Sequence, residues 1–173
     1  MSAGPGASTL GKRPAYVALG SNIEAERNLP RAVSALRRLG EVRSISHVYE
    51  SEAVGPAGQP RFLNAVVALD AADQADELRV KLRQVEADMG RVRTSDKFAP
   101  RPIDLDLVAV DDFIDADLAA RAYLAVTLAE VAPGLIFAGT GEPVAARAEQ
   151  LRSTSDLRHR PDVDGSIAKE LQR

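Results

Sequence analysis

Residues 101–108 read Arg-Pro-Ile-Asp-Leu-Asp-Leu-Val, an apolar run that carries two aspartates at alternate positions. A β-strand turns alternate side chains to opposite faces, so Asp104 and Asp106 share one face while the leucines point to the other. Two carboxylates on one face repel each other unless a cation neutralises them, and Mg²⁺ prefers oxygen ligands and keeps positions for substrate phosphates. The stretch therefore predicts a strand with a magnesium site on its polar face. A solvated strand face is the alternative.

Basic side chains precede this strand. The formal net charge of the chain is −3, yet several cations fall in the span that leads into the aspartates: Arg83, Arg91, Arg93, Lys97 and Arg101. Arginine forks bind phosphate oxygens bidentately, and a metal ion bridges phosphate to carboxylate. The combination predicts a bound polyphosphate, although each cation taken singly fits an ordinary solvated surface.

Composition narrows the class of protein. A chain of 173 residues with 45% hydrophobic residues predicts one domain with a proper core. The absence of cysteine excludes a disulfide framework and a thiolate site, and it fits a cytoplasmic location. The acidic balance and the low aromatic content of 4% argue against a nucleic-acid partner, and no apolar stretch is long enough to predict a membrane partner. The sequence carries no signal for an oligomeric state.

The predicted elements up to residue 110 alternate between strands and helices. They are a strand at 16–19, a helix at 29–39 capped by Asn28 and ended by Gly40, a strand at 42–49, a loop at 51–60, a strand at 62–69, a helix capped by Asp73 and ended by Gly90, and a strand at 104–110. This β-α-β-β-α-β order predicts an α+β ferredoxin-like sandwich, with helices on one face of an antiparallel sheet and the other face free for a ligand.

The ends of the chain give weaker patterns. Beyond residue 110 we expect a helix at 118–130, a hairpin at 135–143 and a last helix at 144–152. Residues 1–14 are predicted to form a flexible leader, residues 15–152 a single domain, and residues 153–173 a polar tail without helical periodicity.

Separated motifs in one order resemble a known family. They are Ala18-Leu19-Gly20-Ser21-Asn22, Val54-Gly55-Pro56 with Gln59-Pro60, Phe62-Leu63-Asn64-Ala65, Gly90-Arg91-Val92-Arg93 and Pro100-Arg101-Pro102-Ile103-Asp104-Leu105-Asp106-Leu107. From about residue 16 to residue 135 the chain is similar to 6-hydroxymethyl-7,8-dihydropterin pyrophosphokinase, a folate-pathway enzyme that moves pyrophosphate from ATP to a pterin hydroxyl. The resemblance implies the same α+β fold and the same activity.

For the nucleotide, the resemblance implies that Asp104 and Asp106 hold two Mg²⁺ ions against the phosphates of ATP. Arg91 and Arg101 would bind triphosphate oxygens, so these four residues are the expected catalytic set. The pterin hydroxyl would attack the β-phosphorus in line, and AMP would leave. The other implied nucleotide-binding residues are Glu86, Arg93 and Arg121. For Glu86, an exposed helix charge is an equally good interpretation.

For the pterin, the resemblance implicates Asn64, whose amide offers both a donor and an acceptor to the ring edge. The expected stacking or apolar faces are Phe62, Phe98 and Tyr123, and the other lining residues are Gly20, Ser51 and Val54. Without the resemblance, Phe62 and Phe98 would be interpreted as ordinary residues of the hydrophobic core. Asn64 differs, because an amide inside an apolar strand needs a polar partner when it is buried.

The chain departs from the family pattern at three places. Phe98 stands where the family usually has tryptophan, Thr127 replaces a proline, and residues 107–120 lack the usual Pro-His element and a further arginine. Three interpretations therefore stay open: a pyrophosphokinase, with full or reduced activity; a non-catalytic relative that binds pterin or nucleotide; and a palm-like nucleotidyl transferase. The small size and the lack of a basic face argue against the third.

Overall fold

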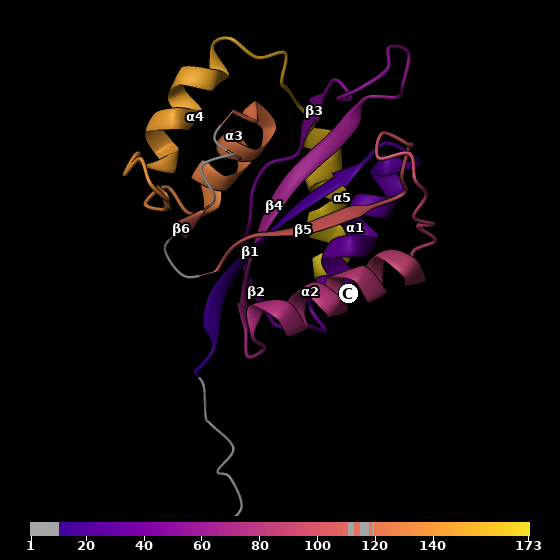
Figure 1. Ribbon diagram of the computed structural model, residues 1–173. Coiled ribbons are helices and arrows are strands. Elements are labelled where there is room, and N and C mark those ends of the chain that lie inside the picture. Colours follow the sequence, from indigo (N-terminus) through magenta and orange to yellow (C-terminus); the bar gives the residue numbers. More distant parts are fainter. Residues whose placement is uncertain (1–10, 111–112, 115–117, 119) are drawn as a thin grey trace, which may run out of the picture.

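The computed structural model describes residues 11–110, 113–114, 118 and 120–173. Its first elements are β1 (Arg13–Ser21), α1 (Ala25–Leu36), β2 (Glu41–Ile45), β3 (Tyr49–Ser51), β4 (Phe62–Ala71), α2 (Ala75–Asp88) and β5 (Asp104–Val110). The remaining elements are β6 (Phe113–Ile114), α3 (Ala122–Val131), β7 (Ile136–Phe137), α4 (Val144–Arg152), β8 (Arg158–His159) and α5 (Pro161–Leu171) (Figure 1). The predicted β-α-β-β-α-β order is confirmed, with its second strand split into β2 and β3.

The strands form one sheet in the order β7-β6-β5-β1-β4-β3-β8, and β2 also pairs with β4. Every pair is antiparallel except β6 with β7. In the central pair, Gly20 of β1 lies opposite Asp104 of β5, and Ala18 lies opposite Asp106. On its other side, Gly20 lies opposite Asn64 of β4. The register therefore brings the acidic pair and Asn64 to the same end of the central strands.

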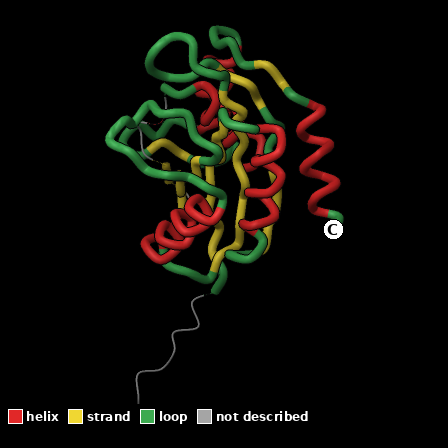
Figure 2. The backbone as a smooth tube through the Cα atoms, turned by 90° about the vertical axis from the view of Figure 1, so that its right-hand side faces the viewer, coloured by secondary structure: helices red, strands yellow, loops and turns green. Residues whose placement is uncertain are grey.

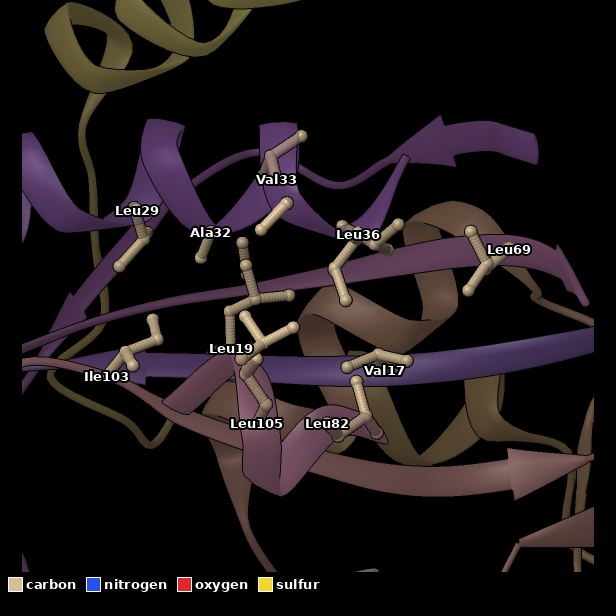
Figure 3. Packing of buried hydrophobic residues seen from close by; sticks show 14 of the residues in the cluster. Val17, Leu19, Leu29, Ala32, Val33, Leu36, Leu69, Leu82, Ile103 and Leu105 are labelled. Carbon is tan, nitrogen blue, oxygen red and sulfur yellow. The ribbon is translucent and has the colours of Figure 1, made fainter. Parts of the chain in front are cut away.

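Helices cover both faces of this sheet to different extents. The larger core joins apolar residues of α1, α2 and α5 to one face of β1, β4 and β5. Figure 3 shows part of it, with Leu29 and Leu36 of α1 above Val17 and Leu19 of β1. Helix α3 packs over the other face in a second core, together with Ile114. The expectation that this face is wholly free is therefore wrong, because α3 and α4 cover the part of it seen at the upper left in Figure 1.

Strand β1 and helix α1 begin earlier than predicted. β1 starts at Arg13 rather than at residue 16, so the end of the predicted leader pairs with β4, while residues 1–10 lie outside the described residues. Helix α1 starts at Ala25, after Glu24 with a left-handed φ of 44°. Asn28 is not the cap. It lies inside the helix, is buried, and donates a hydrogen bond from Nδ2 to the carbonyl oxygen of Ile23 at 2.8 Å.

Two further boundaries differ from the sequence prediction. Helix α2 is capped by Gln74, which forms a capping box with Glu77, whereas Asp73 binds the ammonium group of Lys81. The predicted strand at 42–49 breaks at residues 46–48, where Ser46 bonds to β4 through both its backbone and its hydroxyl group. A side chain that bonds to the neighbouring backbone replaces the regular ladder there.

The segment after β5 is only partly as expected. Helix α4 has the predicted bounds, Val144–Arg152, but α3 begins at Ala122 rather than at residue 118. The predicted hairpin at 135–143 is short: it has one antiparallel bridge and backbone hydrogen bonds from Phe137 to Glu142 and from Val144 to Leu135, and β7 also pairs in parallel with β6. Residues 111–112, 115–117 and 119, in the stretch that departs from the family pattern, lie outside the described residues.

The segment from residue 153 onward is not irregular, so that expectation is wrong. Strand β8 pairs with β3, and α5, the helix that ends near the C mark in Figure 2, packs beside α1. Its apolar residues Val163 and Ile167 are buried in the main core. Pro161 in the first turn and the acidic residues of that turn suit a helix start. The helix was missed because only a few apolar positions carry its periodicity. Within the described part of the chain, no helix has the length and apolar character needed to cross a membrane.

Candidate active site

A cavity of about 330 Å³ opens on the face of the sheet opposite α1 and α2. Every residue predicted to contact a pterin lines it: Gly20, Ser51, Val54, Phe62, Asn64, Phe98 and Tyr123. Four residues predicted for metal or nucleotide line it as well: Arg101, Asp104, Asp106 and Arg121. Glu86, Arg91 and Arg93 do not line it. The residues predicted to bind the pterin and four of those predicted to bind metal or nucleotide therefore share one cavity. The other three predicted nucleotide-binding residues lie outside it.

Asp104 is held by two arginines. Arg101 Nη1 donates a hydrogen bond to Asp104 Oδ2 at 2.9 Å, and Arg91 Nη1 donates to Oδ1. Partial burial by itself raises the pKa of the Asp104 carboxyl, but the hydrogen bond and charge of Arg91, with the charge of Arg101, outweigh it and lower the pKa below its ordinary value. Asp104 is therefore an ionised carboxylate whose oxygens are already oriented.

Asp106 differs from its neighbour. Among the described residues, no side chain or backbone group donates a hydrogen bond to its carboxylate. Its side chain reaches solvent, but the protein around the cavity restricts its hydration, and this desolvation raises the pKa of the Asp106 carboxyl. The negative charges of Asp104 and then Glu86 raise that pKa further. Asp106 is therefore a carboxylate without a hydrogen-bond donor among the described residues, and the charges of Arg91 and Arg121 offset only part of the rise in its pKa.

Glu86 lies behind the cavity wall and is 1% exposed. It accepts hydrogen bonds from Arg91 Nη1 at 2.6 Å, from Arg93 Nη2 at 2.7 Å and from the backbone nitrogen of Leu105 at 2.8 Å. Its interpretation as an exposed helix charge is therefore wrong. Arg91 bonds to both Glu86 and Asp104. Glu86 therefore orients Arg91, which in turn holds Asp104.

The other end of the cavity is built around Asn64, which is 5% exposed. Its Nδ2 donates to Ser51 Oγ at 2.9 Å and to the carbonyl oxygen of Tyr49 at 3.2 Å. The prediction that the Asn64 amide needs a polar partner is confirmed, and Ser51 and Tyr49 of the protein are the partners. Among the described residues, no donor reaches Asn64 Oδ1, which lies 3.8 Å from the place where a Cβ on Gly20 would stand. The acceptor oxygen therefore faces the cavity.

Two loops meet above these strands. Gly55 has a φ of 122°, and a Cβ atom there would stand 2.7 Å from the ring of Phe98. Glycine is therefore required both for the backbone conformation and for the approach of the two loops. Phe98 and Phe62 are partly exposed rather than part of the buried core, so both side chains are available as walls of the cavity.

Two residues that were not predicted as site residues hold these loops in place. Ser21 Oγ donates to the carbonyl oxygen of Pro102 at 2.6 Å, and Asn22 Oδ1 accepts from the backbone nitrogen of Arg101 at 2.8 Å. Asn22 Nδ2 also donates to the carbonyl oxygen of Pro60 at 3.3 Å. Their place in the first family motif was the signal in the sequence. Lys97, one of the cations that precede the acidic pair, also lines the cavity, as does Glu52, which was not predicted.

Thr127 and Arg121, which frame the departure from the family pattern, both belong to α3. Arg121 is the N-cap residue and its side chain reaches the cavity beside Asp106, whose pKa its charge lowers. Thr127 is 1% exposed and its hydroxyl group donates to the carbonyl oxygen of Tyr123 at 2.6 Å, one turn earlier. The threonine is therefore satisfied inside the helix and does not face the cavity.

Comparisons with known sequences identify the family of the chain. A family described as 7,8-dihydro-6-hydroxymethylpterin-pyrophosphokinase (HPPK) matches residues 16–133. A Pseudomonas aeruginosa protein named 2-amino-4-hydroxy-6-hydroxymethyldihydropteridine pyrophosphokinase is 38% identical over 132 residues, covering 69% of this chain and 81% of its own length. A protein of the same name from Synechocystis is 32% identical over 170 residues, covering 90% of this chain and 86% of its own length.

Solved structures show the same fold at low sequence identity. A Plasmodium falciparum HPPK-DHPS chain solved with SDX-DHP superposes with a TM-score of 0.67 at 12% identity, covering 84% of this chain and 47% of that chain. The wild-type protein solved with pteroate gives a TM-score of 0.65 at 10% identity, covering 82% of this chain and 45% of that chain. This chain thus spans about half the length of these solved chains. On the sequence match, the chain belongs to the 7,8-dihydro-6-hydroxymethylpterin-pyrophosphokinase family.

Proposed function

We propose that the cavity binds ATP together with 6-hydroxymethyl-7,8-dihydropterin and transfers the terminal pyrophosphoryl group to the pterin hydroxymethyl group. The observation that carries this proposal is the shared cavity: an acidic pair and arginines line one end, and an amide between aromatic side chains lines the other. The membership of the family supports the same reaction. The chain is thus a pyrophosphokinase, a diphosphotransferase of folate synthesis.

Asp104 and Asp106 are the proposed ligands of two Mg²⁺ ions. Both offer carboxylate oxygens, the ligand type that Mg²⁺ prefers, and they stand on one face of β5 within the cavity. Asp106 has no partner among the described residues and carries a raised pKa, so a nearby cation would relieve an unfavourable negative charge. When bound, the ions would neutralise charge on the phosphate oxygens.

Arginines around the acidic pair would complete the phosphate site. The guanidinium of Arg101 is held by the carbonyl oxygens of Lys97 and Ala99 as well as by Asp104, so its remaining donor capacity faces the cavity in a fixed direction. Arg121 approaches the same region from α3. Arg91 is oriented by Glu86, and we propose that its charge acts on the triphosphate across Asp104. Preoriented cations cost no rearrangement as charge develops in the transition state.

At the other end, Asn64 would read the edge of the pterin. Its amide nitrogen is committed to Ser51 and Tyr49, which leaves Oδ1 as an acceptor toward the cavity. This arrangement selects a ligand edge that carries N–H donors, as the amino-pyrimidine ring of a pterin does. Phe62, Phe98 and Tyr123 would cover the ring faces.

The reaction that these residues support is an in-line displacement. The hydroxymethyl oxygen attacks the β-phosphorus of ATP, the bond from that phosphorus to the oxygen bridging it to the α-phosphorus breaks, and AMP leaves with that oxygen. The hydroxyl proton is lost to solvent. The protein contributes the relative position of the two substrates and the stabilisation of charge on the transferring oxygens.

The decisive experiment measures AMP release from ATP, Mg²⁺ and 6-hydroxymethyl-7,8-dihydropterin. We expect pterin-dependent AMP formation by the unchanged protein and none above background by Asp106→Asn. If the unchanged protein bound the pterin but released no AMP, the non-catalytic alternative would replace this proposal. Template-dependent incorporation of nucleotides would support the nucleotidyl transferase alternative, and we expect none.

A further inference from the structure

The two histidines of the chain meet at a corner that does not line the cavity. His47 lies in the connection between β2 and β3, and His159 lies on β8. Their rings are in edge contact with centroids 4.7 Å apart. Asp164, from the first turn of α5, joins them, and one potential ligand atom from each of the three side chains lies within 4.8 Å of the other two. Residues far apart in the sequence thus present two imidazoles and one carboxylate at a single point.

The backbone segments that carry these side chains are bonded to each other. The backbone nitrogen of Val48 donates to Asp164 Oδ1 at 2.7 Å, and its carbonyl oxygen accepts from the backbone nitrogen of Arg160 at 2.8 Å. Tyr49 and His159 are register partners in the β3–β8 pair. The positions of the three side chains relative to each other are therefore fixed by the fold before any ligand arrives.

Carboxylates orient the two rings. Glu130 Oε2 accepts from the backbone nitrogen of His47 at 2.8 Å and lies 3.2 Å from its Nδ1. With Nδ1–H donated to Glu130, His47 Nε2 keeps its lone pair free. A carboxylate that holds the second nitrogen of a histidine in this way is typical of zinc sites. Asp164 Oδ1 is taken by Val48, which leaves Oδ2, and this oxygen lies 2.6 Å from His159 Nε2.

We propose that His47, His159 and Asp164 bind a divalent transition-metal ion, with Zn²⁺ as the expected occupant and water in a fourth position. Zinc binds imidazole nitrogen and carboxylate oxygen at about 2.0–2.2 Å in a tetrahedron, which places ligand atoms about 3.3 Å apart. Small movements of the three side chains would bring their ligand atoms from the present distances to this spacing. Imidazole ligands favour zinc over magnesium, which separates this corner chemically from the all-oxygen pair at Asp104 and Asp106.

Such an ion would tie three pieces of the chain together. It would join the β2–β3 connection to β8 and to the first turn of α5, and α5 contributes Val163 and Ile167 to the main core. Because an ion bound only by the folded chain stabilises it, we expect the C-terminal segment to pack more firmly when zinc is present. This inference does not depend on the proposed reaction, since it involves no residue of the cavity.

The test is a thermal-unfolding titration of the full chain, cleared of metal with a chelator, with Zn²⁺ as the only added divalent ion. We expect Tm to rise by about 5 °C or more at a hundredfold excess over the dissociation constant. The rise should disappear in His159→Gln and in His47→Gln, whose exposed side chains can be replaced without disturbing the core. Asp106→Asn, which removes a ligand from the other acidic site, should keep it.

Cobalt gives a second readout that does not depend on stability. Co²⁺ added to the unchanged protein should give the visible absorption of a tetrahedral ion with nitrogen ligands, and neither histidine variant should show it. An unchanged Tm with Zn²⁺ up to about 100 times the protein concentration would overturn the proposal. The same rise and the same cobalt spectrum in both histidine variants would overturn it as well, by showing that the ion binds elsewhere.

Discussion

The Glu86 cluster (Glu86, Arg91, Arg93 and Asp104) and the open wall of the cavity (Asp106 and Arg121) both hold charges of both signs, and both include an aspartate of β5. In the Glu86 cluster every carboxylate has arginine donors, and Glu86 is buried with three hydrogen bonds. On the open wall, by contrast, Asp106 accepts no hydrogen bond from any residue that the structure describes.

The difference separates carboxylates that the protein itself satisfies from one that it leaves without a donor among the described residues. A buried carboxylate is tolerated when donors satisfy it, and it then fixes the groups around it. A carboxylate that faces a cavity without a donor is kept at a cost in stability, which fits a group whose partner arrives with the ligand. The two aspartates of β5 thus share a face and a motif and are both proposed metal ligands, but only Asp104 is also held by arginines of the protein.

The largest expected effect is on catalysis through the open wall. Asp106→Asn should lower the rate of AMP formation at least about 10³-fold, because a neutral amide replaces a proposed metal ligand in a site that acts through electrostatics. Circular dichroism should show a folded protein. Asp76→Asn is the matched control, since the Asp76 side chain is 97% exposed on α2. Retention of full activity by Asp106→Asn would mean that the open wall is ordinary strand surface.

The second effect is on stability through the Glu86 cluster. Glu86→Gln should lower the free energy of unfolding by about 3 kcal/mol, because Arg91 and Arg93 lose the buried charge that faces them. Denaturant unfolding would measure the change, and Asp76→Asn should stay within about 0.5 kcal/mol of the unchanged protein. Equal stability of Glu86→Gln and the unchanged protein would remove the structural role assigned to this cluster.

A third prediction uses pH to distinguish the two aspartates without added metal. The pKa of Asp106 is raised in the folded state, so its ionisation destabilises the fold as pH rises through that pKa. Asp106→Asn should therefore raise Tm at pH 7, and the gain should fade as pH falls toward the pKa of the unfolded chain. Asp104→Asn should do the opposite, because the pKa of Asp104 is lowered: its contribution is present above the unfolded pKa and is lost on acidification. Parallel melting curves from pH 3.5 to pH 7 would show the two signs, and equal signs would refute the comparison.

The smallest expected effect lies at the edge of the Glu86 cluster. Arg93 pairs with Glu86, but its side chain is 59% exposed, so solvent screens much of the interaction. Arg93→Ala should cost less than about 1 kcal/mol of unfolding free energy. Arg91→Ala should cost more, because Arg91 is 10% exposed and serves two carboxylates. If denaturant unfolding ranked the two variants in the reverse order, exposure would not be the deciding factor.

The placement of the site was largely predictable from local patterns. Alternation along β5 predicted that both aspartates share a face, and the family resemblance implied the pterin-lining residues from Gly20 to Tyr123, all of which line one cavity. The bounds of α4 and of the strand at 104–110 also followed from local signals. Helix α5 did not, because its few apolar positions matter only when α1 is beside them.

By itself, the sequence determined the order of elements up to residue 110, the family and the candidate site residues, because strand alternation, helical spacing and short motifs are properties of neighbouring positions. Only the tertiary structure decided how those residues are partnered. It placed Glu86 under Arg91, left Asp106 without a donor among the described residues, and brought His47 against His159. Such partnerships depend on the pairing of β1 with β5 and of β3 with β8, which join positions far apart in the chain and leave no local periodicity to read.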